Sequence, residues 1–384
     1  MMRLGICRLL AGAIFLLFFG CTASKNKDIG DDVMVPLKAA LQDESYFVRS
    51  AGIKAIGEMG DPASLPLILP GFKDSVSFVR LFSVESAAQL RGPDTLKLLL
   101  VAGDDPDPMV RVAAVKAIDD LIGTDGKIDA VPMEKLLAPF TKDLDATVHL
   151  FAYAALARHG NEKAFLSLQE LAKSHDVALP AMVALGRTKK KEAIPILFES
   201  IKNADEMIRM MAAEALGEIG SQDALTELAA LITDKVATVR GAAATSLGKM
   251  GHPKAIPVLN QLLNDPELIV QISAAEGLMR LGKKRLDIYE KGLGDPDYGV
   301  RHFAVGSLHK TAGKEALPLL IHALSDQAQR VRIAAVRAIG SIGGTDDAAI
   351  LRKMLNDPDP SVRAYAAGNI GRLLRGVKTA KPGA

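Results

Sequence analysis

A pattern of apolar and small residues recurs along the chain about every 31 residues. Each copy holds a valine or isoleucine, here called the anchor, with a small residue four positions later and an apolar residue eight positions later. Spacings of four and eight place these side chains on one face of a helix. A repeat of this length predicts a solenoid, in which copies of one unit stack side by side. The anchors are Val48, Val79, Val110, Val148, Val177, Ile208, Val239, Val270, Val300, Val331 and Val362.

Aspartate stands five positions before the anchor in nine of these copies, and proline follows it in four. Aspartate caps helix starts and proline suits the first helical turn, so each anchor is expected to lie in a helix that this aspartate caps. A shorter apolar stretch upstream, as in 255–263 and 316–324, predicts a first helix. Glycines such as Gly217, Gly248 and Gly340 are expected to end or loosen the second helix. Each copy is therefore predicted to be a helix–turn–helix unit.

These repeats resemble the HEAT-like repeat family, in the short form of about thirty residues also seen in phycobilin lyase subunits. The resemblance covers roughly residues 34–375. It implies an all-α, right-handed α-solenoid (superhelix) of about eleven repeats whose second helices line a concave wall. We expect one elongated array in which each repeat is buried only against its neighbours. Most members of the family bind or scaffold other molecules, and a few are enzymes.

Arginine directly follows the anchor in eight copies. An anion-binding stripe is one interpretation, but the guanidinium fork suits carboxylates, and arginine recurs at a fixed distance from the aspartate. We therefore predict a structural Asp–Arg ladder that joins successive repeats. Its predicted members are Asp43, Arg49, Asp74, Arg80, Asp105, Arg111, Asp234, Arg240, Asp295, Arg301, Asp326, Arg332, Asp357 and Arg363.

The first twenty residues differ from the repeats. Two arginines precede an apolar run that ends in Leu17-Phe18-Phe19-Gly20-Cys21, which resembles a bacterial lipoprotein signal. That resemblance implies removal of residues 1–20 and lipidation of Cys21, with residues 21–33 as a flexible tether and 376–384 as a disordered tail. An ordinary secretory signal or an uncleaved anchor is the alternative. The expected location is the bacterial envelope, most simply the outer membrane facing the periplasm.

Composition narrows the function further. Without residues 1–20, which carry Arg3 and Arg8, the chain has 45 basic and 45 acidic residues. Nucleic-acid binders usually show a large basic excess, so DNA or RNA is not an expected partner. No metal-binding histidine spacing, phosphate loop or catalytic grouping is present, and we expect neither an enzyme nor a cofactor. Asp119, Asp120, Asp125 and Asp129 match no calcium loop and are expected in a solvated loop.

Two departures from the period single out the middle of the chain. An anchor spacing of 38 residues marks an insertion around 119–139, which is expected to lengthen a loop. In the next two repeats His149 and Ala178 replace the ladder arginine. Pro180 predicts that the second helix there begins late, near Ser174 or Asp176.

The variable positions three, six and ten residues after each anchor are expected to face a partner, which we expect to be a protein or peptide. In repeats four to six these positions combine apolar side chains with a charged rim, a composition typical of interaction sites. The predicted function is a non-enzymatic, membrane-tethered scaffold; the alternatives are a lyase-like or cofactor-handling protein and a structural spacer. The predicted partner-binding residues are Phe151, Arg158, Val183, Arg187, Met211, Glu214 and Glu218.

Overall fold

The computed structural model describes residues 30–92, 94–125 and 132–376. Predictions for residues 1–20 and Cys21, and most of those for the tether and the C-terminal tail, therefore lie outside the described residues. The described residues contain helices and no strands. None of their helices has the length and apolar character that crossing a bilayer requires.

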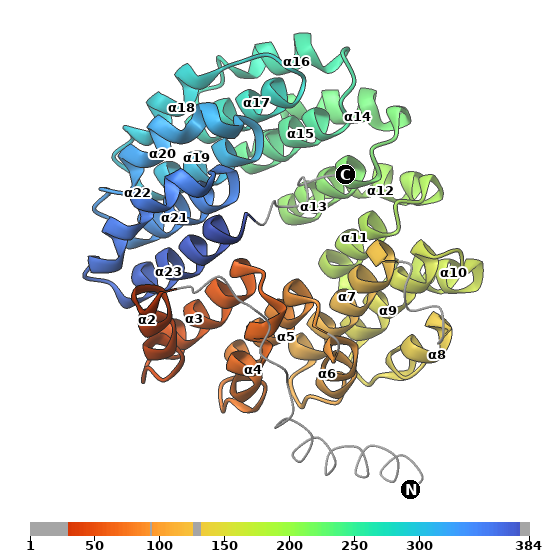
Figure 1. Cartoon of the computed structure of the whole chain (residues 1–384). Helices are drawn as coiled ribbons and strands as arrows, with labels where there is room; N and C mark the ends of the chain where they lie inside the picture. Colours follow the sequence, from red (N-terminus) through yellow and green to blue (C-terminus); the bar gives the residue numbers. More distant parts are fainter. Residues whose placement is uncertain (1–29, 93, 126–131, 377–384) are drawn as a thin grey trace, which may run out of the picture.

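Each repeat is a pair of antiparallel helices, and the pairs follow one another around a ring (Figure 1). The first helix of each pair lies on the outside. These outer helices are α2 (Asp31–Leu41), α4 (Leu65–Ile68), α6 (Thr95–Ala102), α8 (Met133–Leu137), α10 (Glu162–Leu171), α12 (Ile194–Ser200), α14 (Leu225–Ala230), α16 (Ala255–Leu262), α18 (Leu286–Leu293), α20 (Leu317–Ala323) and α22 (Ala348–Arg352). Several begin or end in 3-10 turns, which complete the short outer element.

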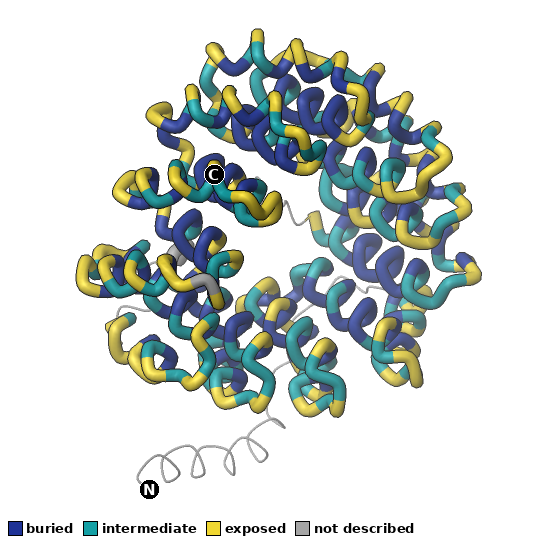
Figure 2. Tube along the Cα trace, turned by 180° about the vertical axis from the view of Figure 1, so that it is seen from behind, coloured by how far each residue is buried: buried dark blue, intermediate teal, exposed yellow. Residues whose placement is uncertain are grey.

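The second helix of each pair carries the anchor and faces the centre of the ring, both in Figure 1 and in the view from behind in Figure 2. Each inner helix packs against the inner helix of the next repeat. The inner helices are α3 (Tyr46–Met59), α5 (Ser77–Leu90), α7 (Pro108–Asp125), α9 (Ala146–Arg158), α11 (Ala178–Arg187), α13 (Glu206–Ile219), α15 (Ala237–Lys249), α17 (Leu268–Arg280), α19 (Tyr298–Thr311), α21 (Gln329–Ile342) and α23 (Pro360–Arg375).

The predicted α-solenoid is confirmed, but the expectation of an elongated array is wrong, because the last repeat packs against the first. Helix α23 contacts both α2 and α3. One hydrophobic core runs through this junction and contains residues of the first and last repeats, such as Leu37, Ile56 and Ile370. Eleven repeats that complete a circle turn by about 33° each, so a small rotation per repeat decides the global shape.

The repeat positions explain this packing. The anchors are mostly buried, and the small residues at the fourth position let outer and inner helices approach. Gly248 is the second-last residue of α15, and a Cβ there would lie 3.2 Å from the carbonyl carbon of Gly277 in α17. This glycine therefore stands in the last turn of its helix, as predicted, and it also permits close approach of two inner helices.

The predicted capping role of the aspartates also needs correction. Asp74 accepts a hydrogen bond from Val76 N at 2.9 Å. Val76 is the residue before α5 begins, so this carboxylate closes the turn that precedes the helix. The capping side chain is an aspartate three positions before the anchor: Asp145 accepts from Thr147 N and Asp359 from Ser361 N, both at 2.8 Å. The prolines of the Asp-Pro pairs lie in the turn and not in the helix.

The freed carboxylates form the Asp–Arg ladder. Arg49 binds Asp74 of the next repeat in a bidentate pair, with Nε–Oδ2 at 2.7 Å and Nη2–Oδ1 at 3.0 Å, while its Nη1 donates to the carbonyl of Asp43. The same arrangement recurs in the pairs Arg80–Asp105, Arg111–Asp143, Arg209–Asp234, Arg240–Asp265, Arg301–Asp326 and Arg332–Asp357. The ladder therefore joins neighbouring repeats, as the recurring residues predicted.

Three predicted members of the ladder, Asp43, Asp295 and Arg363, form no such bidentate pair in the described structure. Gln271 stands where an arginine would bind Asp295, and its amide donates to the carbonyl of Asp265 instead. At the ring closure, Arg363 donates to the carbonyls of Asp357 and Pro358 in its own repeat. Among the described residues Arg363 and Asp43 form no ion pair with each other, so other contacts must hold the closure.

The contacts that hold the ring closed lie toward the C-terminal ends of the inner helices, away from the ladder at their N-terminal ends. Arg337 Nε donates to Glu58 Oε1 at 2.6 Å across the junction, and Asn369 donates to the other oxygen of Glu58 at 3.1 Å. Arg375 binds Asp61 at 2.7 Å. Burial acts against the charged form of Arg337, but Glu58 outweighs it and raises the pKa of the guanidinium.

Candidate binding site on the inner wall

The inner face of the ring is formed by four positions of each inner helix: the residue before the anchor and the residues three, six and ten after it. The first and last of these positions are eleven residues apart in the sequence, or about 16 Å along the helix. In α15, α17 and α19 four of the six third and sixth positions are small or short, namely Ala242, Thr245, Ser273 and Gly306, whereas Glu276 and Phe303 are larger. Elsewhere they hold bulky groups such as Phe82, Phe151, Arg337 and Tyr365.

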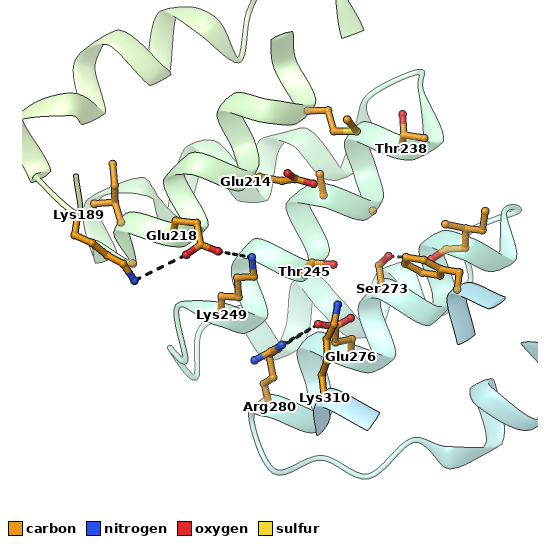
Figure 3. Close-up of a pocket in the computed structure, with 18 residues that line it drawn as sticks. Lys189, Glu214, Glu218, Thr238, Thr245, Lys249, Ser273, Glu276, Arg280 and Lys310 are labelled. Carbon is orange, nitrogen blue, oxygen red and sulfur yellow. Dashed lines mark hydrogen bonds and ion pairs between the residues drawn. The ribbon is translucent and has the colours of Figure 1, made fainter. Parts of the chain in front are cut away.

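This difference creates a concavity of about 760 Å³ on the wall formed by α13, α15, α17 and α19 (Figure 3). Met210, Ile269 and Phe303 line its apolar part, near the N-terminal ends of the inner helices. Thr245 and Ser273 lie in the middle, and charged side chains lie toward the C-terminal ends. From the N-terminal to the C-terminal ends of the inner helices, the concavity thus presents first an apolar region, then hydroxyl groups and then a charged rim.

Most charges at the rim are paired within the wall. Lys249 Nζ donates to Glu218 Oε1 at 2.7 Å, and Lys189 lies 3.9 Å from the other oxygen. Burial opposes ionisation of Glu218, but Lys249 outweighs it, so the pKa of this carboxyl lies below its usual value. Burial raises the pKa of Glu214, which forms no ion pair in the described structure. Glu214 and Lys310 are therefore the charged lining groups left for a ligand.

The carboxylate of Glu276 also lines the concavity, but it is buried and both of its oxygens accept hydrogen bonds. Arg280 Nη2 donates to Glu276 Oε1 at 3.0 Å, and Ser307 Oγ donates to Oε2 at 2.7 Å. Tyr289 lies 3.1 Å from the same serine oxygen, and burial raises the pKa of its phenol to about 12. This series of hydrogen bonds joins α17, α18 and α19, which belong to the repeats between which Gln271 interrupts the ladder.

Of the seven residues predicted to bind a partner, Glu214 and Glu218 line this concavity. Met211 is half-buried and packs against the core, whereas Val183 is 37% exposed on α11. The prediction for Phe151 is wrong, because this ring is 4% exposed and lies beneath Lys116, whose Nζ is 4.0 Å from the ring centroid.

Arg158 and Arg187 bind carboxylates of their own chain. Both donate to Asp119 and Asp120 of α7, with Arg187 Nη2 at 2.6 Å and 2.8 Å and Arg158 Nη1 at 3.1 Å and 3.2 Å. Asp119 is 1% exposed and also contacts His159 at 3.1 Å. This cluster joins repeats three, four and five, and so spans the junction between repeats four and five where His149 interrupts the ladder.

The same cluster corrects the prediction that the aspartates at the insertion lie in a loop. Asp119 and Asp120 do not lie in a solvated loop, since α7 continues to Asp125 and α8 begins at Met133. Residues 126–131 lie outside the described residues. In the fifth repeat a 3-10 turn over His175–Val177 precedes α11, which agrees with the predicted late start of that helix.

Reasoning from the sequence missed Lys249, Arg280, Thr245 and Ser273 as lining residues. Ser273 lies three residues after its anchor, Thr245 six, and Lys249 and Arg280 ten. These are the positions that were predicted to face a partner in repeats four to six. The available signal was the presence of Ala242, Thr245, Ser273 and Gly306 at third and sixth positions in repeats seven to nine, because these short side chains leave room on the wall. Among the described residues, no group of three or more histidine, cysteine, aspartate or glutamate side chains is arranged to hold a metal ion.

These features define a class of protein: an α-solenoid closed into a ring, with a concavity on its inner wall. The family model for HEAT repeats matches residues 34–119, 176–246, 228–288 and 286–371, which together make up most of the chain. The chain therefore belongs to the HEAT-repeat family. No curated protein matches the sequence.

Solved structures with similar folds come from different settings. The complex of CpcE and CpcF of phycocyanin lyase from Nostoc sp. is 19% identical, with a TM-score of 0.42, over 64% of this chain and 97% of that chain. Human deoxyhypusine hydroxylase is 21% identical, with a TM-score of 0.31, over 65% and 97%. Kap121p bound to Ste12p is 15% identical, with a TM-score of 0.39; the similarity covers 93% of this chain and 46% of Kap121p.

Proposed function

We propose that this protein is a non-enzymatic scaffold that binds a protein or peptide segment against the inner wall of the ring. The observation that carries the proposal is the concavity on α13, α15, α17 and α19, which combines apolar, hydroxyl and charged lining groups. Its size and its position on four consecutive repeats suit an extended segment with several side chains. The hydroxyls of Thr245 and Ser273 suit the hydrogen-bonding groups of a peptide backbone.

The charged side chains of the concavity indicate which side chains the bound segment carries. Because Glu218 and Glu276 are already neutralised by Lys249 and Arg280, a ligand gains little by contacting them. Glu214 and Lys310 remain, on opposite sides of the wall, and favour a segment with one basic and one acidic side chain. A cofactor-handling protein and a structural spacer are the competing functions, and the crosslinking experiment below distinguishes them.

A photo-crosslinking residue at Thr245 is expected to capture one dominant protein partner in the native cell. The control is the same residue at Glu199, which is exposed on the outer helix α12. A partner that occupies the wall lies within reach of position 245 and not of position 199. Adducts are measured by gel shift and identified by mass spectrometry.

The alternatives give different results in the same experiment. Equal adducts at both positions, or none, contradict the scaffold proposal. A purified protein that carries a chromophore or another small molecule, lost when Thr245 is replaced by tryptophan, favours a cofactor-handling function. A spacer tolerates that tryptophan without any loss of function in the cell.

We also propose that the ring is tethered to a bacterial membrane through lipid on Cys21, in the outer membrane facing the periplasm. The sequence before Cys21 supports this proposal, together with the absence of any cysteine in residues 22–384. The chain then carries its only remaining thiol at the lipid site once residues 1–20 are removed.

Metabolic labelling with an alkyne fatty acid tests the tether. We expect the wild-type protein to be labelled and to sediment with membranes, and the Cys21→Ser variant to be unlabelled. Cys7→Ser is the matched control and is expected to keep the label, since Cys7 lies within the predicted signal. Labelling of Cys21→Ser, or no labelling of the wild type, argues against a lipid anchor.

A further inference from the structure

Four aromatic side chains gather on the first two repeats, outside the concavity. The ring centroids of Tyr46 and Phe47 are 4.1 Å apart, those of Phe47 and Phe78 6.3 Å, and those of Phe78 and Phe82 4.5 Å. Phe47 is 59% exposed and Phe78 is 42% exposed. We call Tyr46, Phe47, Phe78 and Phe82 the aromatic cluster; it holds four of the seventeen phenylalanine and tyrosine residues in the chain.

The cluster is built by a repeat position. Phe47 and Phe78 each directly precede a buried anchor, and Met109 occupies the same position in the third repeat with 55% exposure. These three side chains therefore follow one another on adjacent inner helices, at their N-terminal ends. A buried anchor beside an exposed aromatic residue shows that the helix already has its core contacts, so the aromatic residue is not needed for packing there. Large exposed apolar groups in series are typical of docking surfaces.

Acidic side chains flank the aromatic cluster and Met109. Asp43 and Glu44 precede α3, and Asp107 precedes α7; none of the three forms an ion pair in the described structure. The nearby arginines are already bound, because Arg49, Arg80 and Arg111 hold carboxylates of the following repeats. Lys54 lies over the ring of Phe82 at 4.2 Å, which shows that this edge accepts a cation on its aromatic face.

We propose that the aromatic cluster, extended by Met109, docks a cationic amphipathic segment of another protein. Aliphatic or aromatic side chains of that segment contact Phe47, Phe78 and Met109, and its lysine or arginine side chains pair with Asp43, Glu44 and Asp107. Carboxylates beside an apolar surface select a basic partner and raise its association rate. This surface is separate from the concavity of α13–α19 and goes beyond the function proposed above.

Two other occupants fit the surface less well. A second copy of the chain brings the same carboxylates against these, and like charges repel. A bilayer with anionic lipids is repelled for the same reason. In addition, α2 runs antiparallel to α3, so the chain enters at Gly30, about 16 Å along the helix from the loop that carries Asp43 and Glu44. A tether at the N-terminus therefore attaches at the opposite face of the ring.

Fluorescence anisotropy with the full ring and a labelled peptide tests the proposal. The probe is an amphipathic helix of about five turns made of leucine and lysine only; the comparison peptide has glutamate in place of lysine. We expect the lysine peptide to bind, with an affinity that falls as salt rises, and the glutamate peptide to bind at least tenfold more weakly. Phe47→Ser with Phe78→Ser is expected to weaken binding of the lysine peptide at least tenfold, although it leaves every charge in place.

The matched control removes two exposed aliphatic side chains from outer helices. Leu166 of α10 is 64% exposed and Ile321 of α20 is 40% exposed, and replacing both with serine is expected to leave the affinity unchanged. Glu44→Lys with Asp107→Lys is expected to weaken binding and to flatten its salt dependence.

Three results would overturn the proposal. One is equal binding of the lysine peptide to the wild type and to the phenylalanine variant. Another is a dimer, seen by sedimentation of the wild type, that the phenylalanine variant abolishes, because the surface then serves self-association. The third is flotation with anionic vesicles that depends on Phe47 and Phe78. None of these results bears on the crosslinks from position 245, so the two proposals fail separately.

Discussion

Replacing Gly368 with alanine is expected to open the ring and to lower the free energy of unfolding by about 1–3 kcal/mol. Gly368 lies in α23 where this helix packs against α3. A Cβ at this position would lie 2.7 Å from the carbonyl carbon of Ala55 and 2.9 Å from its Cβ. Neither atom of Ala55 can rotate out of the way, because one belongs to the backbone of α3 and the other is bonded directly to it. The steric clash is therefore removed only when α23 moves away from α3. Denaturation followed by circular dichroism measures the loss, and small-angle X-ray scattering measures the opening.

Gly306 supplies the control, since it stands at the same repeat position in α19, six residues after its anchor. A Cβ there would have no neighbour within 4 Å. Gly306→Ala is therefore expected to keep the ring closed and to stabilise the protein by about 0.5–1 kcal/mol, the helix preference of alanine over glycine. Two variants with the same stability and the same scattering curve would show that the contact between α23 and α3 does not hold the ring together.

The second large effect is expected from Asp119→Asn, with a loss of about 3 kcal/mol. Removing one partner of a buried ion pair costs about 3–5 kcal/mol, and the lower end applies because Arg158 and Arg187 reach solvent. The carboxylate is 1% exposed and holds two guanidinium groups and His159. No ladder pair joins repeats four and five, so nothing of that kind replaces the lost contact. Thermal and chemical unfolding of the purified ring measure the change.

Glu170→Gln is the control for a charge lost at the surface. Glu170 pairs with Lys173 at 2.7 Å, but both side chains are largely exposed, and such a pair contributes at most about 1 kcal/mol. A loss for Asp119→Asn no larger than that of this control contradicts the view that the cluster substitutes for the ladder. Restoring the fourth repeat's ladder position with His149→Arg is not expected to compensate, since no aspartate stands at the matching position of the fifth repeat.

The interruptions of the ladder follow a common logic. Where His149 lacks the guanidinium, Asp119 and Asp120 bind Arg158 and Arg187. Where Ala178 lacks it, Lys189 lies 3.9 Å from Glu218 of the next repeat, and where Gln271 lacks it, Glu276 and Ser307 connect α17 with α19. At the closure, Glu58 performs this role. In each case the substitute lies toward the C-terminal ends of the inner helices. Repeats that lose one polar connection are thus held by another on the far side of the same helices.

Closure also changes how the array is stabilised. An open solenoid exposes the core-facing surfaces of its first and last repeats and needs special caps there. In this ring each terminal repeat covers the other, and Ala40, Val48 and Ala364 form a small core of their own at the junction. The ring therefore needs no capping repeat, and its terminal repeats keep the ordinary pattern of anchor and small residue.

The sequence by itself determined the repeat and the ladder, because both depend on contacts between a helix and its nearest neighbours. The period, the buried anchors and the recurring Asp and Arg identify the helical pair and join it to the next one. The sequence also placed Glu214 and Glu218 on the inner wall. Helix caps were assigned two residues too early, since aspartate precedes both the turn and the helix.

Only the tertiary structure decided the ring and the surfaces on it. Closure depends on a rotation summed over eleven repeats, and it brings Arg337 to Glu58 across 279 residues of sequence. Arg158 and Arg187 look like free rim charges until α7 places Asp119 beside them, 39 and 68 residues away. The concavity likewise exists because small residues on three neighbouring helices face one space. Such features arise from distances that a local pattern does not encode.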